Sequence, residues 1–200
     1  MTDLIAVVAA YLLGSIPFSL LIARRRGVDL RTAGSGNVGA TNVFRTAGVG
    51  PGIGALALDV AKGSAAVLIA ARVGTGLSVP VAAAVAAIVG HVAPVWLRFR
   101  GGKGVATAAG AFAVLTPMAV GIAVATFLVT LASTRIVSLG SMVSAVVFAV
   151  AVFVTTADPR ISLGAAVTAL IIVVSHRANL LRIIAGTESR VNRRALTNVR

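Results

Sequence analysis

The 200-residue chain is 58% hydrophobic and only 12% charged, with a mean hydropathy of +1.01. A soluble domain is about half apolar and about a quarter charged, and one of this size buries only about 70% of its surface, so a water-soluble fold is excluded. The 18 Lys and Arg residues against 5 Asp and Glu interrupt apolar runs, and one Trp and one Tyr offer little base stacking, which excludes a nucleic-acid partner.

Seven apolar segments predict an all-α, polytopic integral membrane protein with about seven transmembrane helices. A helix needs about 20 apolar residues to cross about 30 Å of hydrocarbon, and proline or charge marks the ends of such runs. The expected segments are approximately 4–23, 52–71, 78–97, 105–115, 117–133, 137–157 and 161–175. Because 105–115 is short, a single span over 105–133 is the alternative.

The basic residues indicate how these spans are oriented. With the N-terminus outside, seven spans place the loops 24–50, 98–104 and 133–137, and the tail from 176, in the cytoplasm. These segments hold every Lys and Arg except Lys62, Arg72 and Arg160. Merging 105–133 would move the Arg-rich tail outside, against the positive-inside rule, so seven spans are favoured. We expect one membrane-embedded domain over 1–200.

The first of three polar islands follows the first span, at Gly34–Arg45. Its glycines let backbone N–H groups converge on a ligand, and the guanidinium of Arg45 suits a phosphate. The alternative is a flexible Gly/Ser/Asn loop with a helix cap. The density of donors, followed directly by a fixed cation, favours an anion site, with candidate residues Gly34, Ser35, Gly36, Asn37, Gly39, Ala40, Thr41, Asn42 and Arg45.

The second island runs from Gly90 to Thr107. Its Gly101-Gly102-Lys103-Gly104 turn opens a predicted helix, where amide dipoles and an ammonium together attract an anion. The spacing is not that of a Walker A loop, and the alternative is a positively charged turn between helices. His91 is either a packing histidine bonded to a backbone carbonyl or part of the site. These residues alone leave both interpretations open.

The third island covers His176–Glu188, after the last predicted span. His176 and Asn179 are spaced to share one helix face, where the pair can contact a substrate hydroxyl or phosphate. The alternative is an amphipathic tail docking on anionic lipid, which is the role expected of Arg190, Arg193, Arg194 and Arg200. Within the second predicted span, Asp59 and Lys62 have the spacing of a mutual salt bridge.

Three motifs together resemble those of the bacterial acyl-phosphate:glycerol-3-phosphate acyltransferase family (the PlsY type). They are GSGNVGATNVFR at 34–45, GHVAPVWLRFRGGKGVAT at 90–107 and HRANLLRIIAGTES at 176–189, with GSIPF at 14–18 and DVAKG at 59–63 in support. The resemblance implies transfer of an acyl group from a fatty acyl phosphate to the sn-1 hydroxyl of glycerol 3-phosphate. The products are lysophosphatidic acid and phosphate, in the first step of phospholipid synthesis, with no cofactor or metal.

Given these two substrates, we form a hypothesis for the roles of the residues in the three islands. Positioning of glycerol 3-phosphate falls to catalytic residues Ser35, Arg45, Lys103, His176 and Asn179. Binding residues are Gly34, Gly36, Asn37, Gly39, Ala40, Thr41, Asn42, His91, Gly101, Gly102, Gly104, Thr107 and Glu188. The glycine-rich loop and the GGKG turn are expected to cradle the acyl phosphate, whose departing phosphate accepts the hydroxyl proton. His176 is the competing base, because its unperturbed pKa suits the task.

Islands gathered on one face favour a reaction chamber in which a lipid-borne reactant meets a soluble one. We therefore expect a multi-pass enzyme of the bacterial inner (plasma) membrane, monomeric, in contact with membrane lipids, with its active site on the cytoplasmic face. Two other classes remain: a small transporter of a phosphorylated solute, and a non-catalytic lipid-binding scaffold.

Overall fold

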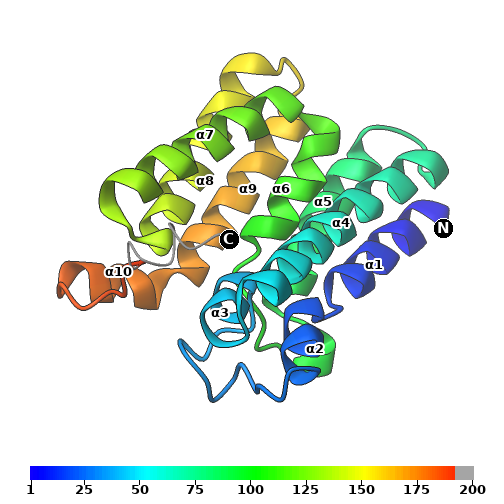
Figure 1. Ribbon diagram of the computed structural model, residues 1–200. Helices are drawn as coiled ribbons and strands as arrows, with labels where there is room; N and C mark the ends of the chain where they lie inside the picture. The colour runs from blue at the N-terminus through cyan, green and yellow to red at the C-terminus, as the bar shows by residue number, and fades with distance from the viewer. Residues whose placement is uncertain (192–200) are drawn as a thin grey trace.

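Helices make up all the regular structure of residues 1–191, which are the residues that this computed structural model describes (Figure 1). The longer ones are α1 (Thr2–Gly14), α4 (Val49–Val73), α5 (Ser78–Val92), α6 (Val105–Leu115), α7 (Pro117–Thr134), α8 (Val137–Thr155) and α9 (Pro159–Ser175). The shorter ones are α2 (Phe18–Arg24), α3 (Ala40–Thr46), the 3-10 turn η1 (Val95–Leu97) and α10 (Arg177–Ile184). The all-α prediction is confirmed. Arg193, Arg194 and Arg200, expected on anionic lipid, lie outside the described residues.

Five helical segments are long and apolar enough to cross a membrane: Thr2–Arg24, Val49–Val73, Ser78–Leu97, Pro117–Thr134 and Val137–Thr155. A sixth is added if α9 and α10, which meet at a bend of 56°, count as one span. Five of the seven predicted segments fall on one helix each, whereas 4–23 is split into α1 and α2 and 78–97 covers α5 and η1. However, α6 has only 11 residues, or roughly 16 Å of helix, so the count of seven and the orientation stay predictions.

The boundary between α6 and α7 is set by Thr116 and Pro117. Thr116 leaves the helical conformation (φ −145°, ψ 67°), and Pro117 occupies the first position of α7. Proline is tolerated there because the first N–H of a helix has no intrahelical partner. Residues 105–133 therefore form two helices, and the alternative of one continuous helix is wrong.

Glycines bring α4 and α6 close together. A Cβ atom added to Gly63 would lie 2.1 Å from the carbonyl oxygen of Thr107, and one added to Gly110 would lie 2.0 Å from that of Val60. Small residues at helix crossings are typical of membrane proteins, where close backbone packing drives association. Farther along, Phe112 is fully buried and meets Phe148 edge to face, with 4.9 Å between ring centroids.

The helix α7 packs differently, because Ala119 is its only buried residue. Its large apolar side chains point outward: Met118, Leu128 and Val129 are 64%, 56% and 69% exposed. An outward apolar face of this size in a chain with several spanning helices is suited to lipid contact.

One end of the bundle carries the polar segments. Figure 1 shows α2, α3 and α10 at this end, together with the loops that precede α3 and α6. The turn between α7 and α8 lies at the same end, because its Arg135 contacts the segment that follows α10. The N–H of Val191 in that segment donates to the carbonyl oxygen of Arg135 at 2.8 Å. The three polar islands therefore lie on the same side of the protein, as their sequence positions predict.

Candidate active site

The glycine-rich loop between α2 and α3 is organised around Asn42. Its side chain is 2% exposed, and its Nδ2 lies 2.9–3.2 Å from the carbonyl oxygens of Leu30, Ala33 and Asn37. The N–H of Ser35 donates to Oδ1 at 3.0 Å. The amide is therefore saturated within the loop. We expected Asn42 to donate to a ligand, and the structure instead uses its side chain to shape the loop that presents its neighbours.

The residues around Asn42 open toward the surface. Gly34 and Gly36 have φ values of +61° and +72°, which only glycine adopts without strain, and a Cβ atom on Gly34 would meet Asn42 Oδ1 at 2.2 Å. The side chains of Ser35, Thr41 and Arg45 are exposed, while Asn37, Gly39 and Ala40 are half-buried. The loop therefore leaves two hydroxyls and a guanidinium accessible to a ligand.

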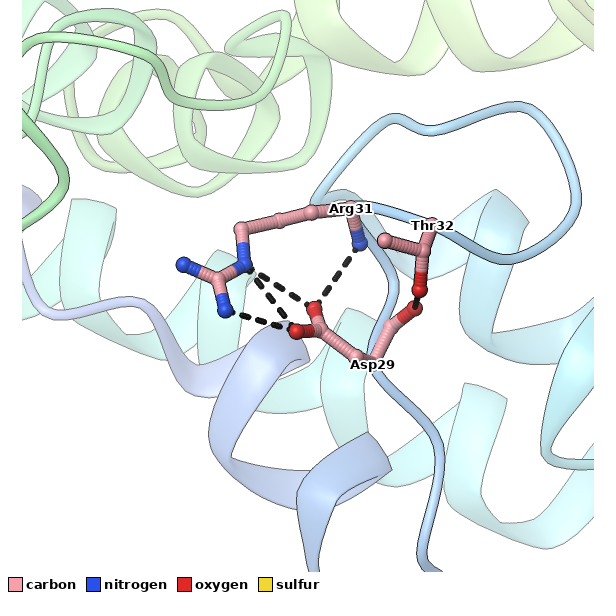
Figure 2. Close-up of polar contacts among 3 residues, drawn as sticks. All are labelled: Asp29, Arg31 and Thr32. Carbon is pink, nitrogen blue, oxygen red and sulfur yellow. Dashed lines mark hydrogen bonds and ion pairs between the residues drawn. The ribbon is translucent and has the colours of Figure 1, made fainter.

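Another cation of this loop is already neutralised. Figure 2 shows Arg31 wrapped around the carboxylate of Asp29, with Nη2 2.6 Å from Oδ2 and Nε 3.0 Å from Oδ1. The backbone N–H of Arg31 donates to the same carboxylate, and the hydroxyl of Thr32 donates to the Asp29 carbonyl oxygen. Hydrogen bonding from Arg31 holds the pKa of Asp29 at about 2. Arg31 is therefore engaged locally, whereas the guanidinium of Arg45 forms no hydrogen bond or ion pair within residues 1–191.

The GGKG turn is held by α5. The N–H of Gly101 donates to the carbonyl oxygen of Val92 and that of Gly102 to the carbonyl oxygen of His91, each at 3.0 Å. These two amides, expected to face the acyl phosphate, are consumed. Gly104 (φ +81°) is the N-cap residue of α6. Within residues 1–191, the N–H groups of the first turn of α6, from Val105 to Thr107, bond to no backbone or side-chain acceptor. The free donors of this island thus start after the glycine pair.

His91 and Thr107 lie behind the turn. The His91 side chain is 8% exposed, its Nδ1 is 3.1 Å from Oγ1 of the fully buried Thr107, and a Cβ atom on Gly102 would lie 2.2 Å from its Nε2. Two residues expected to bind substrate therefore support the turn from the inside. His91 is packed, but its ring faces the hydroxyl of Thr107 and not the backbone carbonyl that the packing interpretation expected.

Lys103 connects the second island to the third. Its ammonium donates to Oδ1 of Asn179 in a short hydrogen bond, and Nδ2 of Asn179 donates to Oε1 of Glu188 at 2.5 Å. Glu188 also accepts from the hydroxyl of Ser138 at 2.7 Å and from Nε of Arg182 at 2.7 Å. Residues from the turn before α6, from α8, from α10 and from the tail thus form one chain of charge-assisted hydrogen bonds.

In this chain of hydrogen bonds, Glu188 has a different role from the substrate binding expected of it. Its side chain is 7% exposed, and its oxygens are taken up by Ser138, Asn179 and Arg182, so it orients Asn179 rather than facing a ligand. Burial alone would raise the pKa of Glu188, but those three hydrogen bonds lower it below its usual value. Ser138 and Arg182 were missed as members of the site. A serine in an apolar span and one arginine among many carry no distinguishing sequence signal.

The environment of Lys103 is strongly basic. Burial, together with the positive charges of Arg182 and Arg45, lowers the pKa of Lys103 to about 8, against the opposing charge of Glu188. The loop that precedes α3 and the turn that precedes α6 lie at the same end of the bundle (Figure 1). Two cations near one buried carboxylate leave an excess of positive charge for a ligand to neutralise.

His176 is 3% exposed at the junction of α9 and α10, and Asn179 in α10 is also buried. Its Nδ1 lies 2.8 Å from the carbonyl oxygen of Ile172. Because a carbonyl oxygen only accepts, Nδ1 carries a proton, which leaves Nε2 as an acceptor in the neutral ring. Among residues 1–191, no three His, Asp or Glu side chains are arranged to hold a metal ion.

An all-helical bundle with five or six segments long and apolar enough to span a membrane is the architecture of an integral membrane protein, and its basic side chains and free amides at one end form a candidate anion site. The profile of the glycerol-3-phosphate acyltransferase family matches residues 4–186, and the chain belongs to that family.

Relatives with the same activity in their names are similar over almost their whole length. The chain is 43% identical over 184 residues to the glycerol-3-phosphate acyltransferase of Trichlorobacter lovleyi, covering 92% of this chain and 95% of the relative. It is 46% identical over 192 residues to that of Anaeromyxobacter sp. (strain K), again covering 92% and 95%.

Two solved structures are also similar, both crystal structures of PlsY, an integral membrane glycerol 3-phosphate acyltransferase. The glycerol 3-phosphate form matches with a TM-score of 0.93 and 37% identity, over 99% of this chain and 100% of that one. The lysophosphatidic acid form matches with a TM-score of 0.90 and 37% identity, over 96% of each chain.

Proposed function

We propose that this protein is a glycerol-3-phosphate acyltransferase that uses a fatty acyl phosphate as donor and releases lysophosphatidic acid and inorganic phosphate. Family membership supports the acceptor, and the PlsY structures carry the names of the acceptor and of the product. The observation that carries the proposal is the hydrogen-bond chain from Lys103 through Asn179 to Glu188, which joins the second and third motifs. The charge of Arg45, at the end of the first motif, also acts on Lys103.

Both proposed reactants carry phosphate, so the site must hold two anions. Each hydrogen bond to a charged group contributes about 1.5–3 kcal/mol net, so a few cations and amides suffice. In our proposal, the acyl phosphate binds the free amides of α6 and the glycine-rich loop at Gly39–Thr41. Glycerol 3-phosphate binds Ser35, Arg45, Lys103, His176 and Asn179. The acyl chain lies in a groove between helices and enters from lipid.

In the proposed reaction the sn-1 hydroxyl oxygen of glycerol 3-phosphate attacks the carbonyl carbon of the acyl phosphate. The new ester C–O bond forms, the anhydride C–O bond breaks, and the phosphate leaves with the electron pair. That departing phosphate takes the hydroxyl proton. A mixed anhydride already has a good leaving group, so orientation and stabilisation of the oxyanion supply most of the rate enhancement. The unprotonated Nε2 of His176 is the competing proton acceptor.

The topology is part of the proposal. Seven spans in one domain over 1–200, with the short α6 surrounded by other helices, place the N-terminus outside and the catalytic end in the cytoplasm of a bacterial inner membrane. The excess of Arg and Lys in the segments at that end supports this orientation. A monomer suffices, because one chain supplies every residue of the proposed site.

Phosphate release from purified protein in detergent tests the proposed function. Protein supplied with acyl phosphate and glycerol 3-phosphate should release inorganic phosphate and form lysophosphatidic acid, while acyl-CoA should not replace the donor. Absence of phosphate release would favour a transporter, which needs two compartments to act. A scaffold predicts that Lys103→Ala and Arg45→Ala fold and bind lipid as the wild type does.

A further inference from the structure

A buried polar network joins α2, α4 and α5 behind the GGKG turn, and the reaction just described does not use it. Ser19, Asp59, Lys62 and His91 are 1%, 1%, 3% and 8% exposed. Asp59, Lys62 and His91 belong to the short motifs DVAKG (59–63) and GHVAP (90–94), and Ser19 directly follows GSIPF (14–18). Buried ionisable groups within a membrane protein are expensive and are retained for a function.

The contacts of the network are closely defined. Asp59 Oδ1 lies 2.9 Å from Nζ of Lys62, as the spacing predicted, and Oδ2 accepts from the hydroxyl of Ser19 at 2.8 Å. Lys62 also donates to the carbonyl oxygen of Ile16 at 2.9 Å, which fixes the break between α1 and α2. The pair is therefore neutral as a unit and anchored on both sides.

The network reaches the turn through His91. Nδ1 of His91 lies 3.6 Å from Oδ1 of Asp59 and 3.1 Å from Oγ1 of Thr107. Oδ1 of Asp59 accepts no hydrogen bond of good geometry within residues 1–191. The opposite edge of the ring packs against Gly102 so tightly that a Cβ atom there would lie 2.2 Å from Nε2. The carbonyl oxygen of His91 also accepts the N–H of Gly102. The position of His91 therefore sets the position of the glycine pair.

The space beside the network is too small for a substrate. The cavity lined by Asp59, Lys62, His91 and Gly102 has room for about one water molecule. The network therefore acts on the reaction through the turn and not by direct contact with a reactant.

We infer that Ser19, Asp59, Lys62 and His91 are positioning residues that hold the Gly101–Gly102 turn, and with it the free amides of α6, in register with the phosphate of the acyl donor. The inference rests on the proposed function, because it assigns that phosphate to the α6 amides. Lys103 is held separately by Asn179 from the side of α10, so the network governs the donor more than glycerol 3-phosphate.

The double variant Asp59→Asn/Lys62→Met tests the inference, because it removes both charges together and leaves no unpaired ion. We expect KM for acyl phosphate to rise about ten-fold, while kcat and KM for glycerol 3-phosphate change by less than about three-fold, which is the signature of lost binding without lost chemistry. The matched control is Ser64→Ala on the same helix. Ser64 also bonds across to α6, at 2.8 Å from the carbonyl oxygen of Gly110, but does not touch His91. Its kinetics should equal those of the wild type.

Hydrogen exchange gives a readout that is independent of activity. The amides of Gly101 and Gly102 should exchange faster in the double variant, while α4, α5 and α6 keep their protection. If the double variant does not fold, Ser19→Ala and His91→Gln replace it, with the same expected shifts. A folded variant with unchanged KM for acyl phosphate and unchanged exchange at the turn would overturn the inference. Lack of phosphate release by the wild type would instead contradict the proposed function. The exchange measurement would still show whether the buried network holds the Gly101–Gly102 turn.

Discussion

Raising the pH from 7 to 9 should switch off Lys103 and thereby slow the reaction. With a pKa of about 8, the ammonium is about 90% protonated at pH 7 and about 10% protonated at pH 9. If only the charged form holds glycerol 3-phosphate, kcat/KM for this substrate should fall roughly ten-fold over that interval, because kcat/KM reports the ionisation of the free enzyme. The second pKa of a phosphate monoester is about 6, so glycerol 3-phosphate is largely dianionic from pH 7 upward.

Unfolding does not explain such a loss. The unfolded chain would hold this proton up to the ordinary pKa of 10.5, while the folded protein releases it near 8. The folded state therefore binds fewer protons than the unfolded state between these two pH values. As a result, Lys103 makes the free energy of unfolding larger, and the folded protein more stable, as the pH rises.

The assay is phosphate release at pH 7, 8 and 9, corrected at each pH for spontaneous hydrolysis of the acyl phosphate. The control is Lys103→Arg, whose side chain stays charged throughout this range. Its kcat/KM should be lower than that of the wild type at pH 7 but nearly constant to pH 9. The reasoning is refuted if the wild type shows no alkaline decline, or if the arginine variant declines in parallel.

Three further predictions concern packing and orientation. Glu188→Gln removes the charge that orients Asn179 and should lower kcat/KM for glycerol 3-phosphate by about ten-fold in the phosphate-release assay, with little change in melting temperature. Gly63→Ala places a methyl group 2.1 Å from a carbonyl oxygen of α6 and should lower the melting temperature by several degrees, whereas Gly121→Ala, with no atom within 4 Å, should not. Asn42→Ala frees the carbonyl groups of the glycine-rich loop and should speed tryptic cleavage there and raise KM for both substrates, while the exposed Thr32→Ala should do neither.

Apolar runs and their interruptions were enough to locate the seven longer helices, but not the break between α1 and α2. Pro117 and Pro159 mark the starts of α7 and α9 because a proline is tolerated in the first turn of a helix and disfavoured in its interior. The sequence could not show how far each helix extends across a membrane. The 11 residues of α6 meet their neighbours through Gly63 and Gly110, and helix contacts of that kind depend on the three-dimensional crossing and not on the local pattern.

The composition of the site was predictable, but the direction of its groups was not. An asparagine such as Asn42 can either bind a ligand or hold a loop together through hydrogen bonds. Only the positions of three carbonyl oxygens in the folded loop show that its side chain does the second. The glycines of the GGKG turn were expected to offer their amides, yet the preceding helix supplies acceptors for two of them. Ser138 joins the chain at Glu188 from 50 residues away, a pairing that no local motif encodes.

The outward face of α7 has a consequence for how the chain tolerates change. Ala119 is the only buried residue of α7, and Met118, Leu128 and Val129 on its outward face are mostly exposed. One aliphatic residue can therefore replace another on this face without disturbing the candidate site. The 18 residues of α7 span roughly 27 Å, close to the thickness of the hydrocarbon core of a bilayer. Reconstitution in lipids of different chain length should therefore affect α7 before it affects the helices of the catalytic end.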